Sequence, residues 1–82
     1  MDRTQQATTA ADEDTRALAR LGGLYDDWRV FGGESGMGMA VVGSTDCGAE
    51  VVARLVRRGL AQVLDGAYVT ITTAGFEAYT SA

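Results

Sequence analysis

Apolar and polar positions follow a helical period in the first third of the chain. The acids Asp12–Asp14 begin the pattern, and negative charge suits the positive end of a helix dipole. Apolar side chains then recur at spacings of three and four, at Leu18, Leu21, Tyr25 and Trp28. We therefore predict a first helix from Asp12 whose apolar stripe faces the core.

Two glycines interrupt this stripe. Gly22 and Gly23 each cost about 1 kcal/mol relative to alanine, so the helix is expected to kink or restart there unless another backbone approaches closely. Trp28 is interpreted as a core anchor at the helix end rather than as a ligand-stacking residue. The next segment, Arg29–Phe31, is expected to form a short strand.

A second helical pattern covers Asp46–Arg58. One side of this helix is apolar or small and the other is charged. The apolar side holds Ala49, Val52, Leu55, Val56 and Gly59, and the charged side holds Glu50, Arg54, Arg57 and Arg58. Asp46 is the expected N-cap, with Ser44 and Thr45 as alternatives, and Gly59 suits the left-handed C-cap position.

The pattern then changes to alternation, which is typical of strands. Asp65-Gly66 separates two alternating runs and favours a type I′ hairpin turn, because both central residues of that turn need positive φ. A two-residue loop predicts Leu64 opposite Ala67 and Leu60 opposite Ile71. The expected core face of the hairpin is Leu60, Leu64, Val69 and Ile71.

A short last helix is expected after the hairpin, capped by Thr72 or Thr73, with Phe76 and Tyr79 on one side. The chain from about Val51 to Tyr79 therefore resembles the second half of a winged helix-turn-helix domain, and ITTAG at 71–75 resembles the junction that follows the wing. The resemblance implies an α+β fold with three to four helices and a two-stranded hairpin wing. Residues 46–58 would be the recognition helix of a domain at 12–82, and the polar residues 1–11 are expected to form a disordered arm.

A glycine-rich segment, GGESGMGMAVVG at 32–43, precedes the second helix. We predict a short helix over Glu34–Val42, where the family places the first helix of the helix-turn-helix. The alternative is a strand over Met39–Val42, because glycine weakens a helix. A strand there would degrade the helix-turn-helix and disfavour direct contact with DNA. The glycines match neither GxxxxGK[ST] nor GxGxxG, so they do not predict a phosphate loop.

The 82 residues allow one domain with a net charge of −4. The chain has no histidine and one cysteine, Cys47, so we expect no zinc site of the usual kind, no nucleophile paired with a base, no enzyme activity and no cofactor. Cys47 is interpreted as a small half-buried residue, with a redox-sensing thiol as the less favoured alternative. No apolar run is long enough for a membrane span and no signal peptide is evident, so a cytoplasmic protein without a membrane partner is expected.

Charge is unevenly distributed: residues 1–50 carry nine acids and four arginines, whereas residues 51–82 carry three arginines and two acids. The first hypothesis is a sequence-specific transcriptional regulator, bacterial, archaeal or viral, whose recognition helix binds double-stranded DNA. Its candidate nucleic-acid-binding residues are Ser44, Thr45, Arg54, Arg57 and Arg58. The alternative for these arginines is a solvated face in which Glu50 pairs with Arg54.

The second hypothesis is a winged-helix protein-interaction module, for instance a viral or plasmid-borne factor that binds a host regulator or polymerase. Its acidic first helix, with Asp12–Asp14 and Asp26–Asp27, would face a basic partner. A homodimer is a further hypothesis under either function. Its contact would use Tyr25, Trp28, Phe76 and Tyr79 if the first and last helices meet.

Overall fold

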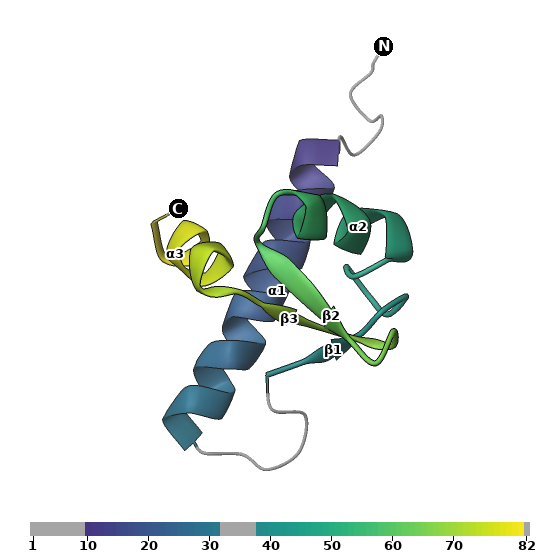
Figure 1. The fold of residues 1–82 in the computed structure, drawn as a ribbon. Coiled ribbons are helices and arrows are strands. Elements are labelled where there is room, and N and C mark those ends of the chain that lie inside the picture. The colour runs from purple at the N-terminus through teal and green to yellow at the C-terminus, as the bar shows by residue number, and fades with distance from the viewer. Residues whose placement is uncertain (1–9, 32–37, 82) are drawn as a thin grey trace.

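The computed structural model describes residues 10–31 and 38–81, which form three helices and a three-stranded antiparallel sheet (Figure 1). The elements are α1 (Ala10–Phe31), β1 (Ala40–Val41), α2 (Ala49–Arg57), β2 (Ala61–Leu64), β3 (Tyr68–Ile71) and α3 (Thr73–Ser81). The sheet order is β1-β3-β2, and α1 packs against α2, α3 and β3. The α+β class is confirmed, but the sheet is not a two-stranded hairpin alone, because β1 in the glycine-rich segment adds a third strand to it.

The first helix is longer than predicted. α1 begins at Ala10, two residues inside the predicted arm, and runs through Phe31 without interruption, so the strand predicted at 29–31 is wrong. The predicted restart at the two glycines is also absent. A Cβ built on Gly22 would lie 2.4 Å from Cγ of Tyr79, so it is an aromatic ring rather than a backbone that approaches the helix. α1 therefore requires glycine at this position in order to pack against α3.

The strand alternative for the glycine-rich segment is confirmed. β1 pairs with β3 through Ala40↔Val69 and Val41↔Tyr68. The predicted helix over Glu34–Val42 is wrong for the described residues 38–42, and residues 34–37 lie outside the described range. Residues 42–48 form turns and an isolated bridge between Ser44 and Cys47, so no helix stands between β1 and α2.

The second helix starts later than predicted. Gly48 is the N-cap of α2 and offers no side chain, whereas Asp46 has a left-handed backbone with φ of 66° and does not cap the helix. The predicted C-terminal signal is confirmed at Gly59, which has φ of 76°. Gly59 N–H donates to Val56 O at 3.0 Å and Leu60 N–H donates to Leu55 O at 2.9 Å, the two hydrogen bonds of a Schellman motif.

The hairpin has the predicted turn but a different register. Asp65 and Gly66 both have positive φ, and Ala67 N–H donates to Leu64 O at 3.1 Å, as in a type I′ turn. Ala67 is then an additional residue, a bulge, and the first strand pair is Leu64↔Tyr68. The predicted pairs are therefore wrong by one residue, and Ala61 replaces Leu60 opposite Ile71.

The core lies where α1, α2 and the inner face of the sheet meet. Its fully buried large side chains are Leu21, Leu55, Val69 and Cys47. The predicted cap of α3 is confirmed at Thr72, whose Oγ1 accepts from Gly75 N–H at 3.0 Å and donates to Gly59 O at 2.7 Å. This hydroxyl ties the end of α2 to the start of α3.

Candidate interaction surface

The arginines of α2 contact the acidic start of α1. Arg54 donates through Nε to Asp14 at 2.9 Å and through Nη2 to Glu13 at 2.8 Å. Arg58 Nη1 lies 3.4 Å from the second carboxylate oxygen of Asp14. Asp14 is buried, with 7% of the residue exposed. α1 therefore supplies two carboxylates to these arginines, and in the described part of the chain Arg54 pairs with them rather than with Glu50.

These hydrogen bonds fix Arg54 in its charged state. The bond to Asp14, followed by the bond to Glu13, raises the pKa of Arg54 above its ordinary value. An arginine that neutralises two carboxylates has little charge left for a phosphate backbone. Arg54 and Arg58 therefore hold α2 against α1 in this structure.

The other predicted nucleic-acid-binding residues do not converge with them. Arg57 is exposed and makes no ion pair within residues 10–31 and 38–81. Ser44 Oγ donates to Val41 O within the turn that precedes α2, and Thr45 is exposed in the same turn. The predicted set is thus divided between the segment before α2 and the C-terminal end of that helix.

The acidic surface predicted for a protein partner is also partly occupied. Glu13 and Asp14 bind the α2 arginines, and Asp26 accepts from Arg29 Nη2 at 2.7 Å. Two of the predicted acids and two of the predicted arginines, each expected to face a partner, are thus paired with one another within the chain. Asp27 is an exposed acid of α1 without an ion pair in the described part of the chain.

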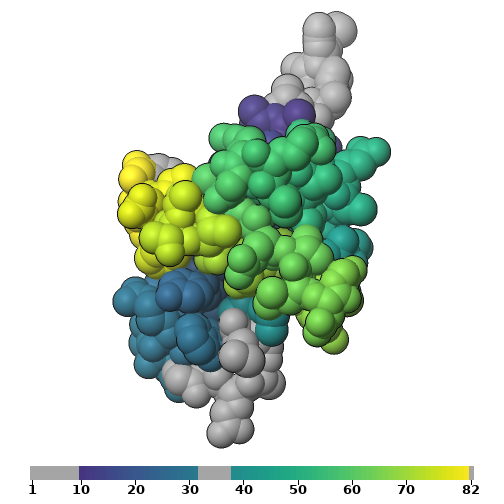
Figure 2. All heavy atoms as spheres, viewed as in Figure 1, coloured from purple at the N-terminus to yellow at the C-terminus, as the bar shows by residue number. Residues whose placement is uncertain are grey.

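An apolar groove lies on the other flank of α2, between that helix, the hairpin and the segment after β1. Its volume is about 410 Å³. The aliphatic lining includes Val42, Ala49, Ala53, Val56 and Val63, and Arg57 is the one charged residue of the lining. Val56 and Val63 are each 40% exposed. In Figure 2 the atoms of α2 and of the hairpin meet on the side that faces the viewer.

A row of exposed apolar side chains crosses the outer face of the sheet. Val41 pairs with Tyr68, which pairs with Leu64 on its other side, so one residue from each strand contributes to the row. Their exposed fractions are 54%, 44% and 39% in that order. Leu64 was predicted to be buried. The one-residue change of register places it on the outer face and places Ala61 in the core.

Cys47 is fully buried rather than half-buried. Burial raises the pKa of its thiol above the ordinary value of 9.0, and this effect outweighs the opposite influence of Arg20. A buried, protonated thiol is a poor nucleophile, so the geometry favours a packing role for Cys47. Among the described residues, no group of three or more potential ligands is placed to hold a metal ion.

Four aromatic residues join α1 to α3. The ring centroids of Tyr25 and Phe76 are 5.1 Å apart, those of Phe76 and Tyr79 are 5.6 Å apart, and those of Tyr25 and Trp28 are 5.7 Å apart. The first and last helices therefore meet, as the homodimer hypothesis requires. In the structure these rings contact one another within a single chain.

The groove was missed at the level of the sequence because both of its walls depend on long-range packing. Val56 and Val63 carry no local signal that separates a groove residue from a core residue.

No family model, curated protein or solved structure matches this chain significantly. None of the helices within residues 10–31 and 38–81 has the length and apolar character needed to cross a bilayer.

Proposed function

We propose that this chain is a small protein-interaction module that holds an apolar segment of a partner protein in the groove between α2 and the hairpin. The observation that carries the proposal is the contrast on α2. Arg54 and Arg58 are paired with α1, while Val56 faces an open aliphatic groove together with Val63. Exposed apolar surface rimmed by polar residues is typical of protein-binding sites.

The chemistry of the groove defines the partner. Its aliphatic walls suit small branched side chains, such as those on one stripe of an amphipathic helix. Arg57 stands in the lining without an ion pair in the described part of the chain, so it favours a carboxylate beside that stripe. The partner segment is therefore expected to be an acidic amphipathic helix rather than the basic surface inferred from the sequence.

A winged-helix relationship remains part of this proposal. Two features support it: α2 leads directly into the hairpin, and β1 pairs with β3 as a short first strand pairs with a wing. With β1 at Ala40–Val41, the first helix of a helix-turn-helix would lie between β1 and α2, and residues 42–48 form turns there instead. A module without a helix at 42–48 is better suited to hold a protein on the surface that winged-helix proteins use for DNA.

Peptide selection tests the proposal directly, because the groove itself then chooses the side chains that it binds. Peptides that bind the wild-type chain are selected from a random library and then measured against Val56→Asp. We expect the selected peptides to be apolar and to carry an acidic residue. They should bind Val56→Asp at least about tenfold more weakly than wild type, because the new charge would be buried against aliphatic side chains.

Val41→Asp is the matched control, since Val41 is 54% exposed but lies outside the groove. We expect it to leave peptide binding unchanged. Arg57→Glu should reverse the preference for acidic peptides. Equal binding to Val56→Asp and wild type would refute the proposed surface.

DNA binding is the second candidate, and the observation that favours it is Arg57. This residue is exposed at the end of the helix that precedes the hairpin, where a recognition helix would present a basic side chain. Strong binding would require Arg54 and Arg58 to exchange their carboxylate partners for phosphates. The cost of leaving the buried Asp14 carboxylate without a partner opposes that exchange.

A further inference from the structure

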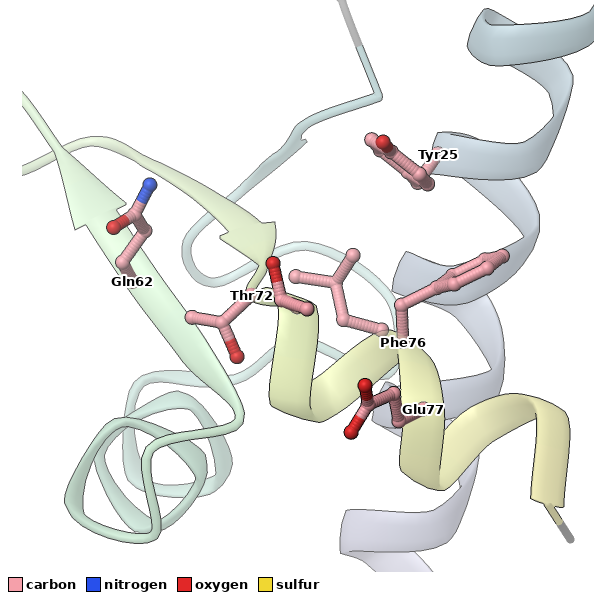
Figure 3. A pocket seen from close by; sticks show the side chains of 7 residues that line it. Tyr25, Gln62, Thr72, Phe76 and Glu77 are labelled. Atoms are coloured by element: carbon pink, nitrogen blue, oxygen red, sulfur yellow. The ribbon is translucent and has the colours of Figure 1, made fainter.

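A second cavity lies between α1, the sheet and α3, and it shares no residue with the groove. Its volume is about 550 Å³, within the range typical of small-molecule sites. Figure 3 shows Tyr25 extending from α1 toward the sheet, Gln62 on β2 across from it, and Phe76 and Glu77 on α3. α1 and the distant C-terminal segment that forms the hairpin and α3 thus contribute to one opening.

The cavity has an aromatic wall and an apolar floor. Tyr25 and Phe76 meet edge to face, with ring centroids 5.1 Å apart and an interplanar angle of 65°. Ile71 beside them is 6% exposed and continues into the core. Such walls accommodate a flat or aliphatic body, and the faces of aromatic rings carry partial negative charge.

Among the described residues, the polar part of the lining carries a single charge, which is negative. Glu77 belongs to the lining, and its carboxylate makes no ion pair within residues 10–31 and 38–81. Gln62 contributes an amide from the opposite side. The Thr72 hydroxyl already donates its hydrogen to Gly59 O, so it offers a ligand only acceptor capacity. A cation is the charge type that this lining favours.

We propose that this cavity binds an organic cation, an ammonium or guanidinium group attached to an apolar body. A cation–π contact of this kind already exists within the chain, because Arg29 Cζ lies 5.6 Å from the centroid of the Phe76 ring. Arg29 is not part of the lining, and its charge is balanced by Asp26 at 2.7 Å. Arg29 thus lies between an aromatic ring and a carboxylate. A ligand cation would lie in the same way between the Tyr25–Phe76 pair and the carboxylate of Glu77.

The cation can come from a free amine or from a side chain of a bound protein. Two probes separate these sources while sharing the chemistry: 2-phenylethylammonium, and an acetylated, amidated tripeptide with a central arginine. Each is titrated into the ¹⁵N-labelled full chain at low salt. We expect saturable shifts of the amide signals of Gln62, Thr73 and Glu77 with at least one probe, and the tighter probe identifies the source.

The neutral analogue 2-phenylethanol has nearly the same shape and tests whether charge matters. We expect it to bind at least about threefold more weakly than the ammonium probe, the change that one partly exposed ion pair supports. Glu77→Gln should weaken the cation by the same factor and leave the alcohol unaffected. Glu50→Gln, at an exposed acid outside the cavity, is the matched control and should change neither.

Three results would overturn the assignment. These are the absence of saturable shifts with both cations, equal binding of the alcohol and the ammonium probe, and unchanged cation affinity in Glu77→Gln. Phe76→Leu adds an independent check on the aromatic wall and should weaken the cation if the amide spectrum shows an intact fold. A folded Phe76→Leu with unchanged affinity also counts against the site.

Discussion

The two flanks of α2 differ in what covers them. The flank that faces α1 carries Arg54 and Arg58, which pair with buried or half-buried acids. The flank that faces the hairpin carries Val56, which is 40% exposed in an open groove. A helical wheel suggests the reverse, with apolar residues inside and arginines outside. The comparison shows that the period of a helix locates its buried centre but does not tell which flank a neighbouring helix will cover.

Geometry explains the difference. Arg54 and Val56 stand on either side of Leu55, each turned from it by about 100° around the helix axis. Leu55 and Val52 point into the core. α1 then packs over the arginine side, where its own acids compensate the charges, and leaves the valine side open.

The largest expected effect separates the centre of α2 from its open flank. Leu55→Ala should lower the free energy of unfolding by about 2–5 kcal/mol, because Leu55 is fully buried and its removal leaves a cavity. Val56→Ala, one residue along, should cost less than about 1 kcal/mol because the side chain is already partly solvated. Urea unfolding measures both. Similar losses would mean that the groove is closed in solution.

The charged flank is probed at Asp14. Asp14→Asn should cost about 2 kcal/mol, because it weakens hydrogen bonds to two arginines at a buried position. Asp27→Asn, at an exposed acid of the same helix, is the control and should be nearly neutral. The loss of stability caused by Asp14→Asn should be smaller when Arg54→Gln is already present. An equal loss in both backgrounds would show that Asp14 and Arg54 are not energetically coupled.

Adjacent glycines in α1 sharpen the contrast between covered and open surface. Gly22→Ala should cost about 1–3 kcal/mol, because the new methyl group meets the Tyr79 ring at 2.4 Å from Cγ. Gly23→Ala has open space and should instead stabilise by about 0.5–1 kcal/mol through helix propensity and a less flexible unfolded chain. Thermal melts of the two variants should move in opposite directions. Parallel shifts would contradict the packing of α3 on α1.

The smallest expected effect concerns Cys47. Because burial raises the pKa of its thiol above 9.0, the folded state holds the proton more tightly than the unfolded state. The resulting stabilisation is fully present below pH 9.0 and is lost as the pH rises above it. Urea unfolding of wild type and Cys47→Ala at about pH 8 and about pH 10, on either side of that value, isolates this contribution. An identical pH dependence in both proteins would exclude it.

Signals that act over a few residues were recovered from the sequence. Gly59 ends α2, Asp65-Gly66 forms the turn and Thr72 caps α3, because each works through its own backbone and immediate neighbours. The hairpin register was not recoverable, since the bulge at Ala67 depends on a distant segment: Val42 N–H donates to Ala67 O at 2.9 Å. The partners of Arg54 were missed for the same reason, as Asp14 is forty residues away in the chain.

The salt dependence of DNA binding tests most directly whether the acids of α1 neutralise Arg54 and Arg58. It is measured by fluorescence anisotropy with a labelled duplex. If Arg57 is the one arginine of the predicted set Arg54, Arg57 and Arg58 that can contact phosphate, the logarithm of the binding constant should fall with the logarithm of salt concentration at a slope of about −0.9. Asp14→Asn should release Arg58, and Arg54 only in part because Glu13 remains its partner, so the slope should steepen to between about −1.8 and about −2.7. A slope near about −2.7 in the wild type, unchanged in Asp14→Asn and reduced by about one in Arg57→Ala, would contradict the account and favour DNA binding.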